Sequence, residues 1–320
     1  GKDIGPMRWD GDVEKLPWNV VRMNARFAVP HKEDRHRARC IDDCSKPDKD
    51  AFNDDQREEK YSMHVVKDMR KAMHRRSWVA LTDAASAFPQ MPLKVEDMPL
   101  CMCATFYDVV RDPELRGSML DAVYAHRFGF FGPRNMPIRW MEVAWVLLAI
   151  AAVRGLRNIY AHMDDFPILG NSEEDCNSKL DAFSELMSER CTGILEKEEK
   201  RVRAFRKGEV LGIGFDLEAF ECYVPKGKLG ELEKDMHRLI DAKHITLLEA
   251  QKILGKLQWY MQAMPAHANC LMQPLFELLV RVKRKEHRMR VRKVQQDAAM
   301  NILDALQQCG GGAEINTCDR

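Results

Sequence analysis

The sequence predicts an α+β protein with a strand-rich beginning, a mixed centre and a wholly helical end. In the centre, short apolar runs that lead into acidic residues predict strands at Trp78–Leu81 and around residues 158–169. Beyond Pro225 the apolar residues recur at helical spacing. Of the 320 residues, 45% are hydrophobic, which is enough to bury a substantial core in one multi-lobed domain or in two smaller domains.

The first 60 residues are polar, contain prolines and carry charges of both signs. Their apolar islands, Trp18–Val21 and Phe27–Val29, predict extended strands and loops that lie over another part of the protein. Residues 61–74 then change to helical spacing, with methionines and a valine on one stripe. After this helix, Trp78–Leu81 predicts a strand that ends at Asp83.

The centre of the chain contains further helices and one long apolar stretch. Helices are expected around residues 97–107 and 139–156. The apolar stretch, Val143 to Val153, is too short to span a bilayer and predicts a buried helix, with no membrane partner.

Two acids separate two apolar runs farther along the chain. Residues 158–163 and 166–169 are apolar, and Asp164-Asp165 lies between them, which predicts a β-hairpin with the acids at its turn. Pro167 lacks an N–H group, so one ladder donor should be missing from the second strand. Ser172, three residues before Asp175, predicts the capped start of a helix. The buried stripe of that helix should consist of Cys176, Leu180, Phe183 and Met187.

The last third of the sequence predicts a hairpin followed by helices. Residues 210–217 and 220–224 should pair as strands. Thr246 and Glu249 form a capping-box pattern that opens a helix. The buried faces of the helices in this part should contain Leu229, Leu232, Met236, Leu239 and Ile240, then Leu247, Ala250, Leu254, Leu257 and Met261.

The ten cysteines bear on the cellular setting. They form no pair of metal-binding knuckles, and their scattered spacing is typical of proteins in a reducing compartment. The N-terminal residues lack the apolar run of a signal peptide. We therefore expect an intracellular protein, with nucleus, cytoplasm and organelle all left open.

Asp83 and the Asp164-Asp165 pair are candidate metal ligands. If their strands are neighbours in a sheet, three carboxylates would meet at one point. Carboxylate oxygens are ligands that Mg²⁺ prefers, and two ions about 3.5–4 Å apart can activate an attacking oxygen and stabilise a leaving group. One acid pair is weak support by itself, because Asp42-Asp43 and Asp54-Asp55 also occur and most such pairs are polar turns.

Six short blocks stand in a fixed order between about Arg26 and Leu279. They are Arg39-Cys-Ile-Asp-Asp43-Cys-Ser45 with Asn53 after it, Asp83-Ala-Ala-Ser-Ala-Phe88-Pro-Gln90-Met-Pro92, Phe128-Gly129, His162-Met163-Asp164-Asp165, Val210-Leu-Gly-Ile-Gly214-Phe215 and Gly255-Lys256-Leu257-Gln258-Trp259. In this order and spacing they resemble the blocks of reverse transcriptases. The nearest kind is the retrotransposon type, of long-terminal-repeat or tyrosine-recombinase elements.

The resemblance implies a right-hand polymerase architecture on the α+β fold. It would have strand-rich fingers, a palm made of an antiparallel sheet and helices, and a helical thumb. The expected boundaries are residues 1–60 for an N-terminal arm and fingers, 61–225 for the palm with the remaining fingers, 226–280 for the thumb, and 281–320 for a basic tail with a flexible end.

The resemblance also implies roles for single residues. Asp83, Asp164 and Asp165 are the expected catalytic acids, holding two Mg²⁺ or Mn²⁺ ions. Phe88 falls where the family keeps the aromatic ring that stacks under the sugar and excludes a 2′-hydroxyl group, the group that distinguishes RNA from DNA precursors.

Other implied contacts are with the nucleotide. Lys32 and Arg39 fall where cations of the fingers clamp the triphosphate, and an arginine can bind phosphate oxygens in bidentate fashion. Gln90 and Gly129 belong to blocks that border the substrate. Lys197 and Lys200 are both candidates for the acid that protonates pyrophosphate, and a solvated surface charge is the alternative for either lysine.

Basic residues near the C-terminus are candidate nucleic-acid contacts. The segment from Arg281 to Lys293 holds eight Lys or Arg residues against the single Glu286, although the whole chain has a net charge of only +1. Clustered cations bind phosphate backbones by releasing counterions. The residues with this expected role are Arg281, Lys283, Arg284 and Lys285, together with Lys256 in the thumb. A solvated helix end explains the same cluster equally well.

Three features depart from the pattern of the family. His162 replaces the usual tyrosine ahead of the acid pair. After Phe128-Gly129, a loop that normally contacts template and incoming base reads Phe-Phe-Gly-Pro-Arg-Asn-Met-Pro-Ile-Arg-Trp140, without the expected small residue, proline and phenylalanine. No segment resembling RNase H or integrase follows the expected thumb.

Two functions remain open from the sequence. The first is an RNA-directed DNA polymerase whose partners are an RNA template, a DNA or RNA primer and deoxynucleoside triphosphates. The second is a non-catalytic descendant that binds RNA as a structural subunit of a larger ribonucleoprotein. An RNA-templated RNA polymerase is disfavoured, because Phe88 should reject ribonucleotides.

Overall fold

The structure is a computed structural model that describes residues 7–9, 23–30, 38–45, 51–57, 59–104, 123–189, 193–264, 266–280, 287–308 and 312–315. The chain divides into two compact units. The first unit consists of Gly1–Met63, Asp83–Gly155 and Ser184–Glu198, and the second consists of His64–Thr82, Leu156–Phe183 and Glu199–Arg320.

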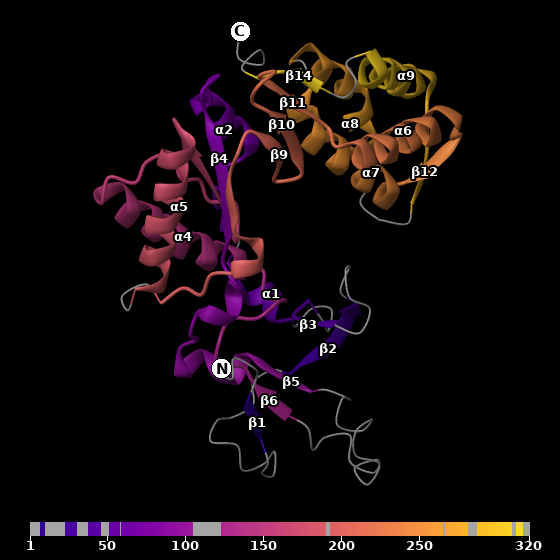
Figure 1. The fold of residues 1–320 in the computed structure, drawn as a ribbon. Helices are drawn as coiled ribbons and strands as arrows, with labels where there is room; N and C mark the ends of the chain where they lie inside the picture. The colour runs from indigo at the N-terminus through magenta and orange to yellow at the C-terminus, as the bar shows by residue number, and fades with distance from the viewer. Residues whose placement is uncertain are drawn as a thin grey trace. The chain divides into compact units, whose positions relative to one another are not determined.

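The first unit contains a five-stranded sheet with the strand order β1-β6-β5-β2-β3 (Figure 1). The strands are β1 (Met7–Trp9), β2 (Met23–Pro30), β3 (Ala38–Asp43), β5 (Met102–Ala104) and β6 (Val123–Ala125). β2 and β5 run parallel, and the other neighbours pair antiparallel. The short helix α1 (Phe52–Asp55) follows β3, and a small core of Cys44, Cys101 and Phe130 packs nearby. The expected strand-rich beginning is therefore present.

The helix predicted over residues 97–107 is wrong where the structure describes it. Val95–Leu100 forms a 3-10 helix, and Met102–Ala104 is strand β5. Pro99 has no N–H group to continue an α-helical ladder, and the next residues pair with both β2 and β6. Sheet pairing thus outweighs the apolar spacing that suggested a helix.

The long apolar helix is present as α4 (Met136–Val153) (Figure 1). It begins earlier than predicted, and its 18 residues, with a mean hydropathy of 1.6, are long and apolar enough to cross a bilayer by composition alone. Ala144, Leu147 and Ala151 are buried, whereas Val146 and Val153 are 61% and 88% exposed. The prediction of a buried helix therefore holds for one face of α4 only.

The second unit contains two sheets. The three-stranded sheet has the order β7-β4-β8, from β4 (Trp78–Asp83, its last residue assigned to the first unit), β7 (Asp165–Gly170) and β8 (Val202–Phe205). The four-stranded sheet has the order β14-β11-β10-β9, from β9 (Lys207–Val210), β10 (Ile213–Asp216), β11 (Glu221–Tyr223) and β14 (Gly312–Glu314). The predicted second hairpin is β10 and β11, and β9 adds a strand before the turn at Leu211-Gly212.

Helices surround these sheets. α2 (Val66–Ala72) precedes β4, and α5 (Glu173–Ser188) follows β7. Ser172 Oγ accepts a hydrogen bond from Asp175 N at 3.1 Å, as the capping pattern predicts. All four residues of the predicted stripe are buried: Cys176, Leu180, Phe183 and Met187.

The helical end of the chain consists of α6 (Lys226–Asp241), α7 (Leu247–Tyr260), α8 (Gln273–Val280) and α9 (Lys293–Gln308). Short elements connect them: 3-10 helices at Met261–Ala263 and Ala266–Met272, and strands β12 (His244–Thr246) and β13 (Arg288–Arg290). The predicted capping box at Thr246 and Glu249 is present, with Glu249 N donating to Thr246 Oγ1 and Thr246 N donating to Glu249 Oε2.

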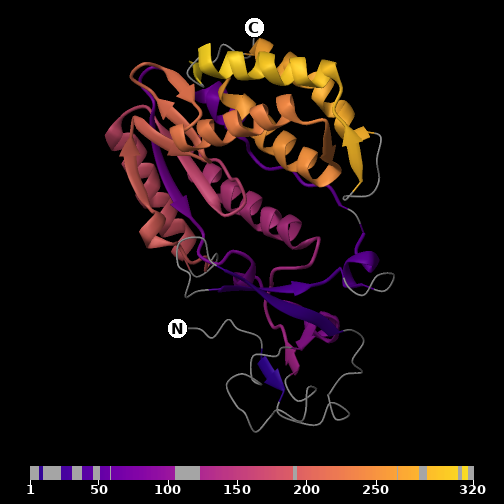
Figure 2. The ribbon, with the colours of Figure 1, turned by 90° about the vertical axis from the view of Figure 1, so that its right-hand side faces the viewer.

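α9 is an ordered part of this core. Ala298, Ala299, Ile302 and Leu306 are buried, and the helix lies along α6 in both views (Figures 1 and 2). β14 then pairs with β11, and Ile315 N donates to Phe220 O at 2.9 Å. The segment beyond residue 280, expected as a basic tail with a flexible end, thus contributes helix and strand to the second unit between residues 293 and 315. The domain boundaries proposed from the sequence stay predictions.

Candidate functional site

Asp83 lies at the end of β4 and is 3% exposed. Within the first unit its carbonyl oxygen accepts a hydrogen bond from Lys197 N at 2.8 Å, and Ala85 N donates to Leu195 O at 2.8 Å. Ser86 then adopts a left-handed conformation, with φ of 53°, where the chain turns into a 3-10 helix at Phe88–Gln90. A positive φ is strained for a residue other than glycine, so the backbone bonds on either side must stabilise this conformation. The turn fixes where Phe88 stands relative to Asp83.

Gln90 uses its side-chain amide to hold this turn. Its Oε1 accepts a hydrogen bond from Leu195 N at 2.6 Å, and its Nε2 donates to Ala85 O and, at 3.3 Å, to Leu195 O. The amide therefore bridges the segment after Asp83 to the strand-like segment beside it. The expected contact between Gln90 and substrate stays a prediction, and the observed contacts give Gln90 a positioning role.

Gly129 packs directly against the backbone of Phe88. A Cβ atom at this position would lie 2.5 Å from Phe88 O and 2.8 Å from the Met136 sulfur. Gly129 N donates to Met91 O at 2.8 Å. Any larger residue would push the Phe88 backbone away, so the glycine is needed for close approach.

The loop of residues 128–135 is anchored to the block that begins at Arg39. Asp42 N donates to Phe131 O at 3.0 Å, and His126 Nε2 lies 2.5 Å from Asp42 Oδ2, with both side chains buried. Asn53 Nδ2 donates to Gly132 O at 3.1 Å, and Arg134 N donates to Asn53 Oδ1 at 2.7 Å. Three blocks of the resemblance thus meet in the first unit: the Arg39 block, the Asp83 block and the Phe128-Gly129 block.

The acid pair lies on a tight hairpin in the second unit. His162 N donates to Asp165 O at 2.9 Å, and Asp165 N donates to His162 O at 3.1 Å, which leaves Met163 and Asp164 as the two turn residues. Met163 has φ of 56°, the positive value that two-residue hairpin turns require. The predicted hairpin is confirmed, with Asp164 in its turn and Asp165 at the start of β7.

The first arm of this hairpin is not a continuous strand, contrary to expectation. Tyr160 N donates to Pro167 O at 2.9 Å, but Pro167 has no N–H group to return the bond. Only the pairings at Ile159 with Ile168 and at His162 with Asp165 are bridges. The N–H group that Pro167 lacks therefore interrupts the hydrogen-bond ladder between the two arms of the hairpin.

His64, just before α2 in the chain, forms hydrogen bonds with the same arm of the hairpin. Ala161 N donates to His64 Nδ1 at 3.0 Å, and His162 Nδ1 lies 2.7 Å from His64 O, so this ring nitrogen of His162 carries the proton. Burial lowers the pKa of His64, and the charge of Asp68 opposes that shift. His64 is thus held as a neutral acceptor.

Trp259 connects the hairpin to two other blocks. Its indole N–H donates to Leu211 O at 3.1 Å, in the turn between β9 and β10, and its ring centroid lies 5.3 Å from that of His162. The remaining three blocks of the resemblance, around His162, Val210 and Gly255, therefore meet in the second unit.

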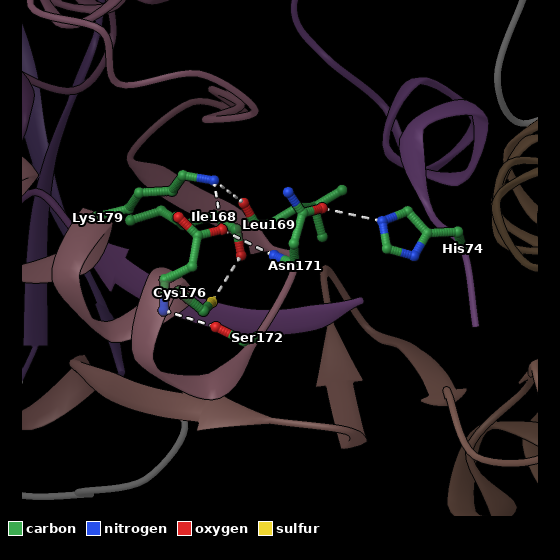
Figure 3. Close-up of polar contacts among 8 residues, drawn as sticks. His74, Ile168, Leu169, Asn171, Ser172, Cys176 and Lys179 are labelled. Atoms are coloured by element: carbon green, nitrogen blue, oxygen red, sulfur yellow. Dashed lines mark hydrogen bonds and ion pairs between the residues drawn. The ribbon is translucent and has the colours of Figure 1, made fainter. Parts of the chain in front are cut away.

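The far end of β7 is tied to α5 by side-chain bonds (Figure 3). Lys179 Nζ donates to Leu169 O at 3.2 Å and to Asp175 Oδ2 at 2.8 Å, and His74 Nε2 lies 3.0 Å from Asn171 Oδ1. Partial burial acts to raise the pKa of Asp175, but the bonds from Lys179 and Asn171 N hold it below its usual range. Burial raises the pKa of the Cys176 thiol to about 11, so this thiol is a packing group that donates to Ile168 O.

The donor chemistry of Asp83, Asp164 and Asp165 suits Mg²⁺ or Mn²⁺, which take hard oxygen ligands. Across the described ranges, however, no three His, Cys, Asp or Glu side chains form a group close enough to hold a metal ion. The structure places Asp83 at the end of β4, Asp164 in the hairpin turn and Asp165 at the start of β7.

Several predicted residues are placed only in part. Lys32, Arg281, Lys283, Arg284 and Lys285 lie outside the described residues, and Arg39 is described only as a residue of β3. Lys256 Nζ lies 2.8 Å from Asp235 Oδ2 and 3.6 Å from Glu231 Oε2. The hydrogen bond to Asp235 raises the pKa of Lys256. Lys256 thus joins α7 to α6, and its contact with nucleic acid stays a prediction.

A cavity of about 690 Å³ lies in the first unit, beside Gln90. Its lining includes Met136, Arg139, Trp140 and Ile194 and none of the three predicted catalytic acids. This cavity is therefore not the predicted metal site.

The sequence did not single out Asp42, His126 or Phe131. The sequence gives Asp42 no role beyond its place in an acidic pair and in the Arg39 block, yet it is 2% exposed and hydrogen-bonded to His126. One available signal was the second Phe-Gly pair, Phe131-Gly132, three residues after the first. Gly132 has φ of 141°, and a Cβ there would lie 2.2 Å from Asp42 O. The second pair is therefore the one that needs glycine for both its backbone conformation and its packing.

Comparison with known proteins identifies the fold. No protein-family model matches the chain, and no curated protein matches it in sequence. Similar solved structures are those of foamy viral protease-reverse transcriptases. The form called dRH, in complex with double-stranded DNA, has a TM-score of 0.65 and 13% identity over 93% of this chain and 45% of that chain.

The protein has a reverse-transcriptase-like fold. A foamy viral protease-reverse transcriptase bound to an RNA/DNA hybrid gives a TM-score of 0.64 at 14% identity, and one bound to double-stranded DNA gives 0.58 at 14%. This chain spans between 35% and 54% of the length of those chains. At this identity the likeness shows the mixed α+β fold alone.

Proposed function

We propose that the protein is an RNA-directed DNA polymerase with Asp83, Asp164 and Asp165 as its catalytic acids. The observation that carries the proposal is the order of strands in the three-stranded sheet. Asp83 is the last residue of β4, β7 begins at Asp165, and β7 is the neighbour of β4 in that sheet. Acids at the ends of neighbouring strands supply the oxygen ligands that Mg²⁺ takes.

Two Mg²⁺ or Mn²⁺ ions held by these acids would lower the pKa of a primer's 3′-hydroxyl and offset charge on the leaving pyrophosphate. In the reaction the 3′-hydroxyl loses its proton to solvent, its oxygen bonds to the α-phosphorus of a deoxynucleoside triphosphate, and the bond from that phosphorus to pyrophosphate breaks. The chain's own part is positioning. The turn at Ser86 and the packing of Gly129 hold Phe88, which we propose excludes a 2′-hydroxyl group.

The proposed partners are an RNA template, a primer and deoxynucleoside triphosphates. The similar foamy viral proteins were solved in complex with double-stranded DNA and with an RNA/DNA hybrid, which supports a nucleic-acid partner. We further propose a retrotransposon-type origin and an intracellular setting. The scattered spacing of the ten cysteines in the sequence supports this setting, because it is typical of proteins in a reducing compartment.

Primer extension on an RNA template, with Mg²⁺ and all four deoxynucleoside triphosphates, tests the proposal. Wild-type protein should extend the primer, and Asp164→Asn and Asp83→Asn should each reduce the rate at least about 10³-fold, about 4 kcal/mol of transition-state stabilisation, because each variant removes a charged metal ligand. Asp304→Asn, at an exposed position on α9, is the matched control and should extend normally. Absence of extension by wild type, under conditions in which a known reverse transcriptase works, would refute the proposal.

The same variants address the alternative of a structural, RNA-binding subunit. That function predicts RNA binding without extension, and no change in binding for Asp164→Asn. Retained RNA affinity in a wild-type protein that does not extend a primer would favour the structural role over the enzyme.

A further inference from the structure

Phe131 places an aromatic ring beside the one that is expected to discriminate sugars. The ring centroids of Phe88 and Phe131 lie 5.1 Å apart, with an angle of 56° between the planes. This tilted geometry is favourable for aromatic pairs. Phe131 is 42% exposed, so its ring lies at the surface of the first unit beside Phe88.

The backbone of Phe131 is fixed on both sides. Asp42 N donates to Phe131 O at 3.0 Å, and the following residue, Gly132, accepts at its carbonyl from Asn53 Nδ2 at 3.1 Å. Gly132 packs so closely on Asp42 that a Cβ would lie 2.2 Å from the Asp42 carbonyl oxygen. The ring therefore projects from a backbone that has little freedom to shift.

The buried side chains of His126 and Asp42 hold the neighbouring backbone in place. His126 and Asp42 are 7% and 2% exposed, and their side chains approach to 2.5 Å. The His126 ring stacks on Phe130, with centroids 3.8 Å apart and planes 4° apart. Phe130 in turn belongs to the small core with Cys44 and Cys101. The residue before Phe131 is thus locked into the core of the first unit, while Phe131 itself faces outward.

We infer that Phe131 is a second specificity-determining residue, whose ring backs Phe88 and keeps it from yielding to a ribonucleotide's 2′-hydroxyl group. The inference rests on the proposed function. An aromatic ring excludes the 2′-hydroxyl group of a ribonucleotide only if the ring cannot move aside. If it can rotate away, the ribonucleotide binds with little loss of free energy. Phe131 resists that movement of Phe88, and Asp42, His126 and Asn53 are positioning residues for Phe131.

The test is the ratio of kcat/KM for a deoxynucleotide to kcat/KM for the matching ribonucleotide, in primer extension by the full chain. The variants are Phe131→Ala, Phe131→Leu, Phe88→Ala and the double variant. Tyr61→Ala is the control, an aromatic residue that is 43% exposed and distant in sequence from the loop. Phe131→Ala should lower the ratio by about 2- to 10-fold, the value of one aromatic pair, and Phe131→Leu should lower it less.

Phe88→Ala should lower the ratio more than Phe131→Ala, and the double variant should be no worse than Phe88→Ala, because a support has no effect once the ring that it supports is gone. An unchanged ratio in Phe131→Ala, or an equal loss in Tyr61→Ala, would overturn the inference while wild-type extension left the proposed function standing. Additive losses in the double variant would also overturn it, since they would make the two rings independent. Wild-type protein that fails to extend any primer refutes the proposed function and the inference with it.

Discussion

The loop of residues 128–135 and the hairpin of residues 158–169 each carry one block of the resemblance, but they are held in different ways. The hairpin is fixed largely by bonds between its own two arms, such as the pair between His162 and Asp165. The loop is fixed by residues far away in sequence, at Asp42 and Asn53. A hairpin of this kind is specified by local sequence, whereas such a loop depends on the fold around it.

Gly132→Ala should be the most damaging single change in the loop. The new Cβ would lie 2.2 Å from Asp42 O and 3.0 Å from the Cys44 sulfur, at a backbone φ of 141° that L-residues rarely adopt. Strain and overlap together should cost about 4 kcal/mol of unfolding free energy, measured by urea denaturation.

Gly155→Ala is the matched control for that change. Gly155 also has a positive φ, 82°, but a Cβ there would meet nothing within 4 Å. Its loss should be about 1–2 kcal/mol, from backbone strain alone. Equal losses at the two glycines would mean that contact with Asp42 does not hold the loop.

Asp42→Ala tests the side-chain part of the same anchor. Removing this carboxylate takes away the hydrogen bond between the two buried side chains, so the loss of unfolding free energy should be about 3 kcal/mol. Glu142→Ala, which removes an exposed partner of Arg139, should cost less than about 1 kcal/mol in the same urea measurement. A small effect at Asp42 would place the anchor in the backbone bonds alone.

These contrasts explain which parts of the structure the sequence could predict. The strand ending at Asp83, the acid hairpin, the stripe of α5 and the capping box at Thr246 were all predicted, because periodicity and capping act over a few residues. The pairing of Met102–Ala104 with two strands was not, since its partners lie far away in sequence. For the same reason the roles of Asp42 and His126 were missed.

The candidate site likewise contains residues that the sequence predicts and a contact that it does not. The acids could be picked out from local strand patterns and from six ordered blocks. The contact between Phe88 and Phe131 could not, because it depends on how a loop without helical or strand periodicity is folded back on β3. The sequence shows two Phe-Gly pairs in this loop, but only the structure shows that Gly132 needs glycine for its backbone conformation as well as for its packing.

Pro167→Ala should have a smaller effect, because it alters the hairpin within its own local pattern. Alanine supplies the missing N–H opposite Tyr160, a gain of about 1 kcal/mol. Two effects oppose this gain. The greater conformational entropy of the unfolded chain costs about 0.7 kcal/mol of unfolding free energy, and the loss of two buried methylene groups costs about 1.6 kcal/mol. A net loss near 1 kcal/mol in urea unfolding is expected. A loss as large as that of Gly132→Ala would erase the distinction between the two regions.

The smallest expected effect is the pH dependence that His64 contributes to the hairpin. Burial lowers the pKa of His64 in the folded protein. As the pH falls through about 6.5, the unfolded chain therefore takes up this proton first, and the stability supplied by neutral His64 is progressively lost toward its lower folded pKa. His64 is half-buried, so solvent screens part of the effect. In urea unfolding at about pH 7.5 and about pH 5.5, wild type should lose more stability than His64→Gln, whose side chain does not titrate. An identical loss in both proteins would mean that the bond from Ala161 N does not depend on a neutral imidazole. The first arm of the hairpin would then be held by its cross-arm bonds and by the backbone of His64, whose carbonyl oxygen accepts from His162 Nδ1, without help from the His64 ring.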